Sequence, residues 1–577
     1  MLIQPIWYTI IEECAPERTA AHGGGDYVRS GMRQRCIAIL LAAVMLTAPV
    51  LCSCSDYAVK SDEVDTSSFI STVWDEPDTT DFQCTTLYYN CAYCVYDRLV
   101  NTVIKHDGRV AMTPSLAETW EISSDGLVYT FHLREGVKFS NGSGLTSSDV
   151  EYTLTRLLTH PDSCNSDIAS CIRGAGKLEK GEAKTLEGFK EISDLDFSIT
   201  LEEPFEAFMA CLSMPGASIL DRETTEEAGD SFGKDTGHTI GTGSFILEEW
   251  TPGKGMIFTA NHDCWKGAPN SEGIRVSFEQ DAAAIRRMFD EGDLDIMDLD
   301  ELDNASDYYL YGDIYQDRLH RAQQVGITYV ALNESVAPLD DVRVRKAMQL
   351  SLDRDMLLEV VYDGAGSVEN GIFPRGLYGY DPSLDKIPYD PDMARSLLSQ
   401  AGHPNGFDIT ISVRPESNQR EMKLLRLIAG MWEKAGINAD IEVLDDSVFM
   451  ERRKNGELGC YVATWIGDYN DPDNFIYTFF GDRDNTTDRS LCYPDEEIMS
   501  RVRDARTITD HDMRLEEYRQ LEKKIIQEDA AWVPLFSRKK IYVTSERLGG
   551  FCNAWTGRFF ARLPEMYIKE PEKTEAR

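Results

Sequence analysis

One carboxylate in the last quarter of the chain is placed where it could hold a cationic group. Asp468 follows Trp465 by three residues, and the turn-forming pair Asp471-Pro472 comes next along the chain. A carboxylate and an ammonium group about 4 Å apart attract by roughly 4 kcal/mol at an effective dielectric near 20, less the cost of removing water from both. Asp residues before such a pair also cap turns, so a purely structural turn is the alternative.

No arrangement of residues indicates catalysis. The chain has neither a G-x-S-x-G sequence nor an H-E-x-x-H sequence, and its nine histidines have no ligand spacing. Cys91 and Cys94 form a single CxxC in an aromatic segment that is predicted to be helical. There they would share one face, and we predict a buried structural role for both. We therefore predict a protein that is not an enzyme and has no cofactor and no metal site.

The composition limits the size class and the partners. A chain of 577 residues is too long for one core, so two to four domains are expected. The net charge of −40 would repel nucleic acid and anionic lipid headgroups. Four of the fourteen cysteines lie before residue 55, and among the others Cys164 with Cys171 is the best local disulfide pair.

The N-terminal region predicts export. Two arginines precede an apolar run from Ile37 to Leu51, which is too short for a confident bilayer span and suits the core of a signal peptide. The sequence from Leu51 to Cys54 resembles a bacterial lipobox. We predict cleavage before Cys54 and acylation of that cysteine, which would hold the protein to the outer face of the membrane by lipid alone.

Short sequence blocks follow one another in a characteristic order. The first are P-S-L-A-E-x-W at 114–120, D-G-L-x-Y-x-F-x-L-R-x-G-V-x-F at 125–139, and a helix predicted over 150–158 with its cap at 146–149. Later blocks are G-T-G-S-F at 241–245, N-x-x-C-W at 261–265, the D-x-R-V-R-x-A sequence starting at 341, and P-x-x-A-x-x-L-L-x-x-A-G at 391–402. From about residue 69 to 555 the order resembles the extracytoplasmic solute-binding proteins of peptide ABC importers, the oligopeptide- and dipeptide-binding family (solute-binding family 5).

The resemblance implies a large bilobal α/β fold of the periplasmic-binding-protein type, in which two strands form a hinge and the first lobe is discontinuous. The implied boundaries are 1–53 for an N-terminal extension and lipoprotein signal peptide, 54–68 for a tether, 69–100, 206–327 and 534–577 for the first lobe, 101–205 for an inserted subdomain, and 328–533 for the second lobe.

The resemblance also implies a binding mode. In this family a carboxylate holds the amino terminus of a peptide, and by position that residue is Asp468. Strand edges that pair with the peptide backbone would be Thr464 to Ile466 on the second lobe and Thr85 to Leu87 on the first. Trp465 would form a rigid wall of a side-chain pocket, and Asp471 would be the turn acid.

The implied function is that of a lipid-anchored receptor on the outer face of the bacterial cytoplasmic membrane. It would be a monomer that binds short peptides and delivers them to the permease subunits of an ABC importer, with no nucleic-acid partner. Two alternatives remain. The same fold could bind another solute, such as an oligosaccharide or a metal chelate, or the protein could be a peptide-sensing lipoprotein without an importer.

Overall fold

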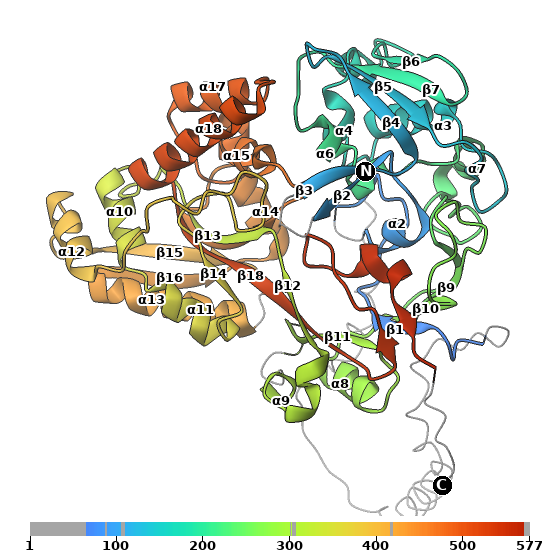
Figure 1. The fold of residues 1–577 in the computed structure, drawn as a ribbon. Coiled ribbons are helices and arrows are strands. Elements are labelled where there is room, and N and C mark those ends of the chain that lie inside the picture. The colour runs from blue at the N-terminus through green and yellow to red at the C-terminus, as the bar shows by residue number, and fades with distance from the viewer. Residues whose placement is uncertain are drawn as a thin grey trace, which may run out of the picture. The chain divides into compact units, whose positions relative to one another are not determined.

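Figure 1 shows the computed structural model of the chain, which describes residues 65–86, 89–104, 110–300, 302, 307–415 and 419–570. The described residues form one compact unit. Its described strands make an eight-stranded sheet, two four-stranded sheets and two two-stranded pairs. Among the described residues, no helix combines the length and apolar character that a membrane crossing requires.

The first four-stranded sheet combines the start of the chain with its middle. Its order is β1 (Ile70–Val73), β10 (Gly273–Ser277), β9 (Gly255–Ala260) and β8 (Phe245–Thr251), with β1 parallel to β10 and the other pairs antiparallel. Helix α2 (Asn90–Val95) packs on the same core through Cys91 and Cys94. Both cysteines are buried, so the predicted structural role of the CxxC sequence is confirmed.

A close backbone approach explains the Gly-Thr-Gly sequence before β8. The Gly243 N–H donates to the Val95 carbonyl at 2.8 Å, at the end of α2. A Cβ atom on Gly241 would lie 2.1 Å from that carbonyl oxygen, and one on Gly243 would lie 2.5 Å from its carbon. Neither position can carry a side chain, and Thr242 between them donates its hydroxyl to Asp97.

The second four-stranded sheet lies in the predicted inserted subdomain. Its order is β4 (Ala117–Ile122), β5 (Val128–Leu133), β7 (Asp196–Thr200) and β6 (Phe189–Glu191), and its neighbours are β2 (Val100–Ile104), β3 (Val110–Pro114), α4 (Asp167–Ser170), α5 (Ala175–Glu179) and α6 (Phe208–Cys211). The predicted helix is α3 (Ser147–Thr159), which begins three residues earlier than expected. Thr146 and Asp149 form the predicted cap, each side chain satisfying the backbone of the other.

The predicted disulfide between Cys164 and Cys171 is wrong. Both thiols are free, and α4 (Asp167–Ser170) lies between them along the chain. Cys164 is exposed on the loop after α3, where its Sγ lies 3.5 Å from the Asp162 carbonyl. Cys171 packs instead against the core of the inserted subdomain. Proximity in sequence suggested the pair, but the intervening helical turn places the two residues in different environments.

The eight-stranded sheet carries the second half of the chain. Its path is β11 (Ile296–Asp298), β18 (Trp532–Thr544), β13 (Gly326–Leu332), β17 (Cys460–Ile466), β15 (Phe407–Val413) and β16 (Ile437–Val443), and β12 (Leu319–Gln323) and β14 (Gly366–Val368) also pair with β18. The long strand β18 pairs with β13 and β14 through Arg538 and with β12 and β11 from Lys539 onward. One continuous strand therefore links the two ends of the sheet.

Helices cover both faces of this sheet (Figure 1). One layer contains α10 (Val342–Leu350), α11 (Arg354–Tyr362), α12 (Pro391–Gln400) and α13 (Gln419–Ala435), and the other contains α14 (Asp446–Lys454), α15 (Pro472–Phe480), α17 (Glu496–Ala505) and α18 (His511–Glu522). All seven residues of β13 are buried, because Tyr329 and Ala331 face the second layer while Val330 and Leu332 face the first.

The remaining described elements are α7 (Arg222–Ala228), α8 (Ala282–Asp290), α9 (Asp307–Leu310), α16 (Arg483–Asp488), β19 (Leu548–Gly549) and β20 (Tyr567–Ile568). The predicted α/β class is confirmed. The predicted domain boundaries stay predictions, as does the predicted hinge of two strands.

Candidate functional site

A strand edge without a strand partner lies at the end of β17. This strand pairs with β13 along its whole length, but it pairs with β15 only at Cys460 and Tyr461. The Gly467 N–H donates to the Val325 carbonyl on the β13 side. Since backbone groups alternate in direction along a strand, the N–H and C=O groups of Thr464 and Ile466 point to the open side.

The open edge faces a cavity of about 420 Å³. Thr464 is exposed there, and its hydroxyl forms a hydrogen bond of 2.8 Å with the Thr328 hydroxyl on β13. Arg414, Glu421 and Arg453 also line the cavity. A backbone edge beside polar side chains and free space can accept an additional extended chain.

Asp468 lies two residues beyond the end of β17 and is oriented by Asn474. The Asp468 N–H donates to Asn474 Oδ1 at 3.0 Å, and the Asn474 amide donates to Asp468 Oδ2 at 3.1 Å. Asn474 is buried in the first turn of α15, so it is a fixed support. In the part of the chain that the structure describes, the Asp468 carboxylate forms no ion pair.

The surroundings of Asp468 disfavour its charge. Desolvation by burial in the cleft raises the pKa of Asp468 to about 6, the Asn474 hydrogen bond opposes this, and Asp167 adds repulsion. The residue is nevertheless exposed, because one side of it faces the open cleft. A carboxylate crowded by protein but open to solvent on one side is well placed to receive a cation.

Trp465 is fixed by the same amide. Its indole Nε1–H donates to Asn474 Oδ1 at 3.2 Å, and its ring packs edge-on against Phe479 at 5.4 Å. The Arg489 guanidinium also lies over the Trp465 ring, 5.2 Å from its centre. The half-buried indole is therefore a rigid wall, and Asn474 couples its position to that of Asp468.

Asp471 has a different role from Asp468. Its side chain caps α15 by accepting from the Asp473 N–H, and it receives two hydrogen bonds from Arg514 at 2.6 and 2.9 Å. Both Asp471 and Arg514 are buried. The assignment of Asp471 as the turn acid agrees with this geometry.

The first-lobe segment is only partly described, since Leu87 lies outside the described residues. Thr85 is not in a strand, and its carbonyl accepts from the Tyr89 hydroxyl and from the Asn165 amide, both at 2.9 Å. Asn165 is buried and also donates to the carbonyls of Phe82 and Gln83. This loop is thus held by Asn165 rather than by a sheet.

Asp468 also lines a second cavity, of about 440 Å³. Tyr93 and Arg98 line it from the N-terminal side, and Trp555 lines it from the C-terminal side. Arg98 donates through Nε and Nη2 to Asn101, whereas its buried Nη1 has no hydrogen-bond partner among the described residues. The cavity is therefore lined by a carboxylate, Asp468, that forms no ion pair among the described residues, and by a guanidinium, Arg98, that has an unused donor there.

Two of these functional candidates were not predicted from the sequence. Asn474 follows the Asp-Pro turn, but nothing in a linear pattern shows that its amide reaches back to Trp465 and Asp468. Arg98 precedes β2 in a segment without a distinctive pattern. Thr464, Trp465, Ile466 and Asp468, which the sequence places close together along the chain, lie at one end of β17.

Comparison with known proteins gives a consistent family. The family model for bacterial extracellular solute-binding proteins, family 5 middle region, matches residues 111–487. Heme-binding protein A of Haemophilus influenzae is 28% identical over 478 residues, covering 81% of this chain and 86% of that protein. The dipeptide-binding protein of Escherichia coli is 27% identical over 479 residues, covering 80% of this chain and 86% of that protein.

A solved structure has the same fold. A periplasmic binding protein of Helicobacter pylori, in complex with the peptide STSA, superposes with a TM-score of 0.70 and 23% identity, covering 87% of this chain and 98% of that one. The predicted bilobal fold class is confirmed by this similarity.

Proposed function

The chain belongs to family 5 of the bacterial extracellular solute-binding proteins, and from this premise we propose that it binds short peptides beside Asp468 and delivers them to an ABC importer. The dipeptide-binding relative and the peptide-bound structural neighbour support this solute class. Lobe closure over the ligand would shift the population from an open to a closed state about the hinge.

The observation that carries the proposal is the Asp468 carboxylate, which lies at the end of an open strand edge and forms no ion pair with any residue that the structure describes. A peptide supplies what this site lacks. Its α-ammonium pairs with Asp468, and its backbone N–H and C=O groups pair with those of Thr464 and Ile466. Because neither contact involves a peptide side chain, the site accepts peptides of different sequence. Trp465 forms one wall of a pocket for a peptide side chain.

Arg98 supports a match at the opposite end of a short peptide. Arg98 lines the cavity that Asp468 also lines, its buried Nη1 has no partner among the described residues, and an ionised carboxylate is the strongest acceptor for such a donor. We assign to Arg98 the recognition of a peptide carboxylate, either the terminus of a short peptide or an acidic side chain.

Heme is the second candidate solute, because a relative of comparable identity is named as a heme-binding protein. The two solutes require different groups: heme has no ammonium group and therefore gains nothing from Asp468. Mass spectrometry of the solute that co-purifies with the protein, followed by calorimetry with a dipeptide, a tripeptide and heme, separates them. Peptide binding that is lost in Asp468→Asn supports the proposal, whereas heme binding with no peptide binding contradicts it.

The lipid anchor is part of the same proposal, although Cys54 lies outside the described residues. Lipidation would keep the receptor close to the membrane-embedded permease subunits. In the native host, Cys54→Ser should release the protein from the membrane fraction. An unchanged membrane-bound fraction contradicts the anchor and leaves the binding proposal intact.

A further inference from the structure

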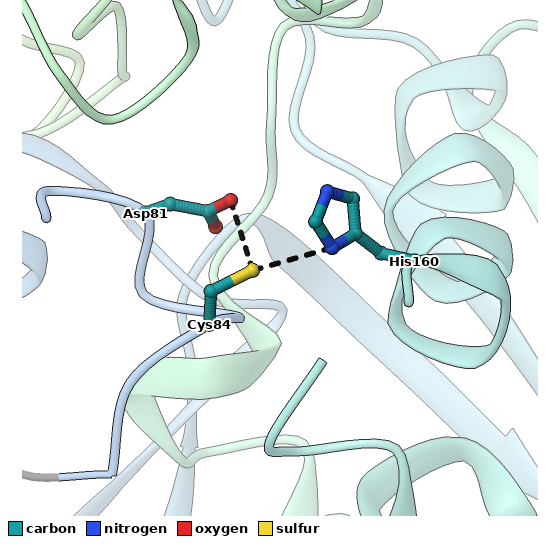
Figure 2. A group of neighbouring side chains, drawn as sticks. All are labelled: Asp81, Cys84 and His160. Carbon is teal, nitrogen blue, oxygen red and sulfur yellow. Dashed lines mark hydrogen bonds between the residues drawn. The ribbon is translucent and has the colours of Figure 1, made fainter. Parts of the chain in front are cut away.

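Three side chains of metal-ligating types meet away from Asp468. Asp81 and Cys84 lie on the loop between β1 and α2, and His160 directly follows α3 (Figure 2). The Cys84 Sγ atom lies 3.2 Å from Asp81 Oδ2 and 3.4 Å from His160 Nδ1. All three donor atoms lie within 4.8 Å of one another.

The spacing of these atoms suits a tetrahedral ion. Zinc bonds of about 2.3 Å to sulfur and about 2.1 Å to nitrogen or oxygen place neighbouring ligand atoms roughly 3.6 Å apart at a tetrahedral angle. The observed contacts at Cys84 are a few tenths of an ångström shorter than this. An ion could therefore enter after a small outward movement of the three side chains, without rearrangement of the backbone.

One acceptor position of the Asp81 carboxylate is available to a metal ion. Its Oδ1 accepts from Arg156 Nη1 at 3.1 Å and from the Gln83 N–H at 3.1 Å. Its Oδ2 accepts from Arg156 Nη2 at 2.5 Å and from the Cys84 thiol. A carboxylate has about four acceptor positions, so only the one that the thiol proton occupies is exchangeable. A metal ion bound by the Cys84 thiolate would replace that proton at the same position.

His160 presents the unprotonated nitrogen that a metal requires. The Asp162 N–H donates to His160 Nδ1 at 3.3 Å, so Nδ1 is the acceptor nitrogen and the ring proton is on Nε2. A metal ion at Nδ1 would displace this long hydrogen bond. Cys84 and His160 are both half-buried, so solvent can reach the site.

We propose that Asp81, Cys84 and His160 form a binding site for Zn²⁺ or a similar divalent transition-metal ion, with water in the fourth position. One thiolate, one imidazole and one carboxylate are a ligand set that zinc accepts. Binding releases one proton, from Cys84. No sequence pattern indicates this site, because Cys84 and His160 are 76 positions apart and ligands at that distance have no recognisable spacing.

The site joins the loop before α2 to the end of α3. Asn165 follows His160 by five residues and holds the carbonyls of Phe82, Gln83 and Thr85. A metal ion at Cys84 would add a second connection between the same two segments. Zinc should therefore raise the melting temperature of the protein, and this should hold whether or not the protein binds peptide.

The test uses the full chain after reduction of its thiols and removal of metal. Zn²⁺ is titrated in competition with a chromophoric chelator, and Co²⁺ is added to a second sample to detect a sulfur-to-cobalt charge-transfer band. Cys84→Ala and His160→Gln should each bind one Zn²⁺ fewer than the wild type. If binding remains, the affinity should fall by more than the roughly 10–100-fold that is lost when a residue that only supports a metal ligand is removed.

Cys552→Ser is the matched control, because Cys552 is also a half-buried thiol beside a carboxylate, 3.4 Å from Glu565, but has no histidine. It should bind zinc as the wild type does. Equal zinc binding by wild type and Cys84→Ala contradicts the proposal. If either variant fails to fold, the cobalt spectrum of the wild type decides, since a spectrum without the charge-transfer band excludes a thiolate ligand.

Discussion

Asp468 and Asp471 lie three residues apart in one turn, yet their surroundings are opposite. Asp471 is buried, caps α15 and receives two hydrogen bonds from Arg514. Asp468 is exposed to the cleft and has a neutral amide, Asn474, as its only described side-chain partner. A buried charge needs a partner within the protein, so the acid that lacks one is the acid available to a ligand.

A third acid of the turn follows the pattern of Asp471. Asp473 is fully buried, pairs with Arg506 at 3.0 Å and accepts from the Tyr469 hydroxyl at 2.9 Å. The Arg506 guanidinium also lies over the Tyr477 ring, 3.8 Å from its centre. Two of the three carboxylates thus stabilise the turn, and this support fixes the position of Asp468.

The largest effect is expected when Asp471 loses its charge. Asp471→Asn removes the carboxylate that is hydrogen-bonded to the buried Arg514 guanidinium and should lower the free energy of unfolding by about 3–5 kcal/mol. Asp468→Asn should not lower it, because the raised pKa of Asp468 means that its charged form is disfavoured in the folded protein. Urea denaturation at pH 7 compares the two variants, and equal losses would remove the distinction between the acids.

Arg98→Met should weaken the binding of a short peptide with a free carboxylate by about 1.5–3 kcal/mol, the usual range for a hydrogen bond to a charged group. The same peptide with an amidated terminus should bind both proteins alike. Calorimetry with the two peptides measures this, and an equal loss for the amidated peptide would mean that Arg98 only supports the cavity wall.

Asn474→Ala removes the amide that orients both Trp465 and Asp468, and should weaken peptide binding by about 1–2 kcal/mol. Asn485→Ala is the control. Asn485 is a half-buried amide that donates to the Tyr477 carbonyl at 2.6 Å, but it does not contact the cleft acid. The control should lose stability without losing affinity, and similar affinity losses in the two variants would contradict the positioning role of Asn474.

Acid should weaken peptide binding through Asp468. The pKa of its carboxyl is about 6 in the ligand-free protein, so the form that pairs with an ammonium group is present above that pH and is lost below it. Between pH 7 and pH 5 the affinity for a free-amine peptide should fall by roughly tenfold. Asp468→Asn should lose most of this dependence, and an unchanged pH profile in that variant would assign it to another group.

The sequence predicted the parts of the fold that have strong local patterns. The capping sequence at Thr146 and Asp149 begins a helix, and the order of the family blocks indicated the bilobal class. These signals are local or depend on order along the chain. Which acid of the turn faces the cleft depends on Arg506 and Arg514, which lie more than thirty residues away.

The same limit explains the errors and omissions. Cys164 and Cys171 are close in sequence, but α4 separates them along the chain and only Cys171 packs on the core. Cys84 and His160 are far apart in sequence and adjacent in space. Asn474 has an ordinary position in the first turn of a helix, and only its side-chain direction makes it important. Contacts of this kind are set by tertiary packing, which sequence patterns do not record.

The central claim is that Asp468 pairs with the free ammonium group of a peptide. Calorimetry of wild type and Asp468→Asn, each with a free and an N-acetylated peptide, tests it most directly. Either change alone should weaken binding by about 2–5 kcal/mol, and the two should not add, because both remove one interaction. An acetylated peptide that binds the wild type as tightly as the free peptide would contradict the claim.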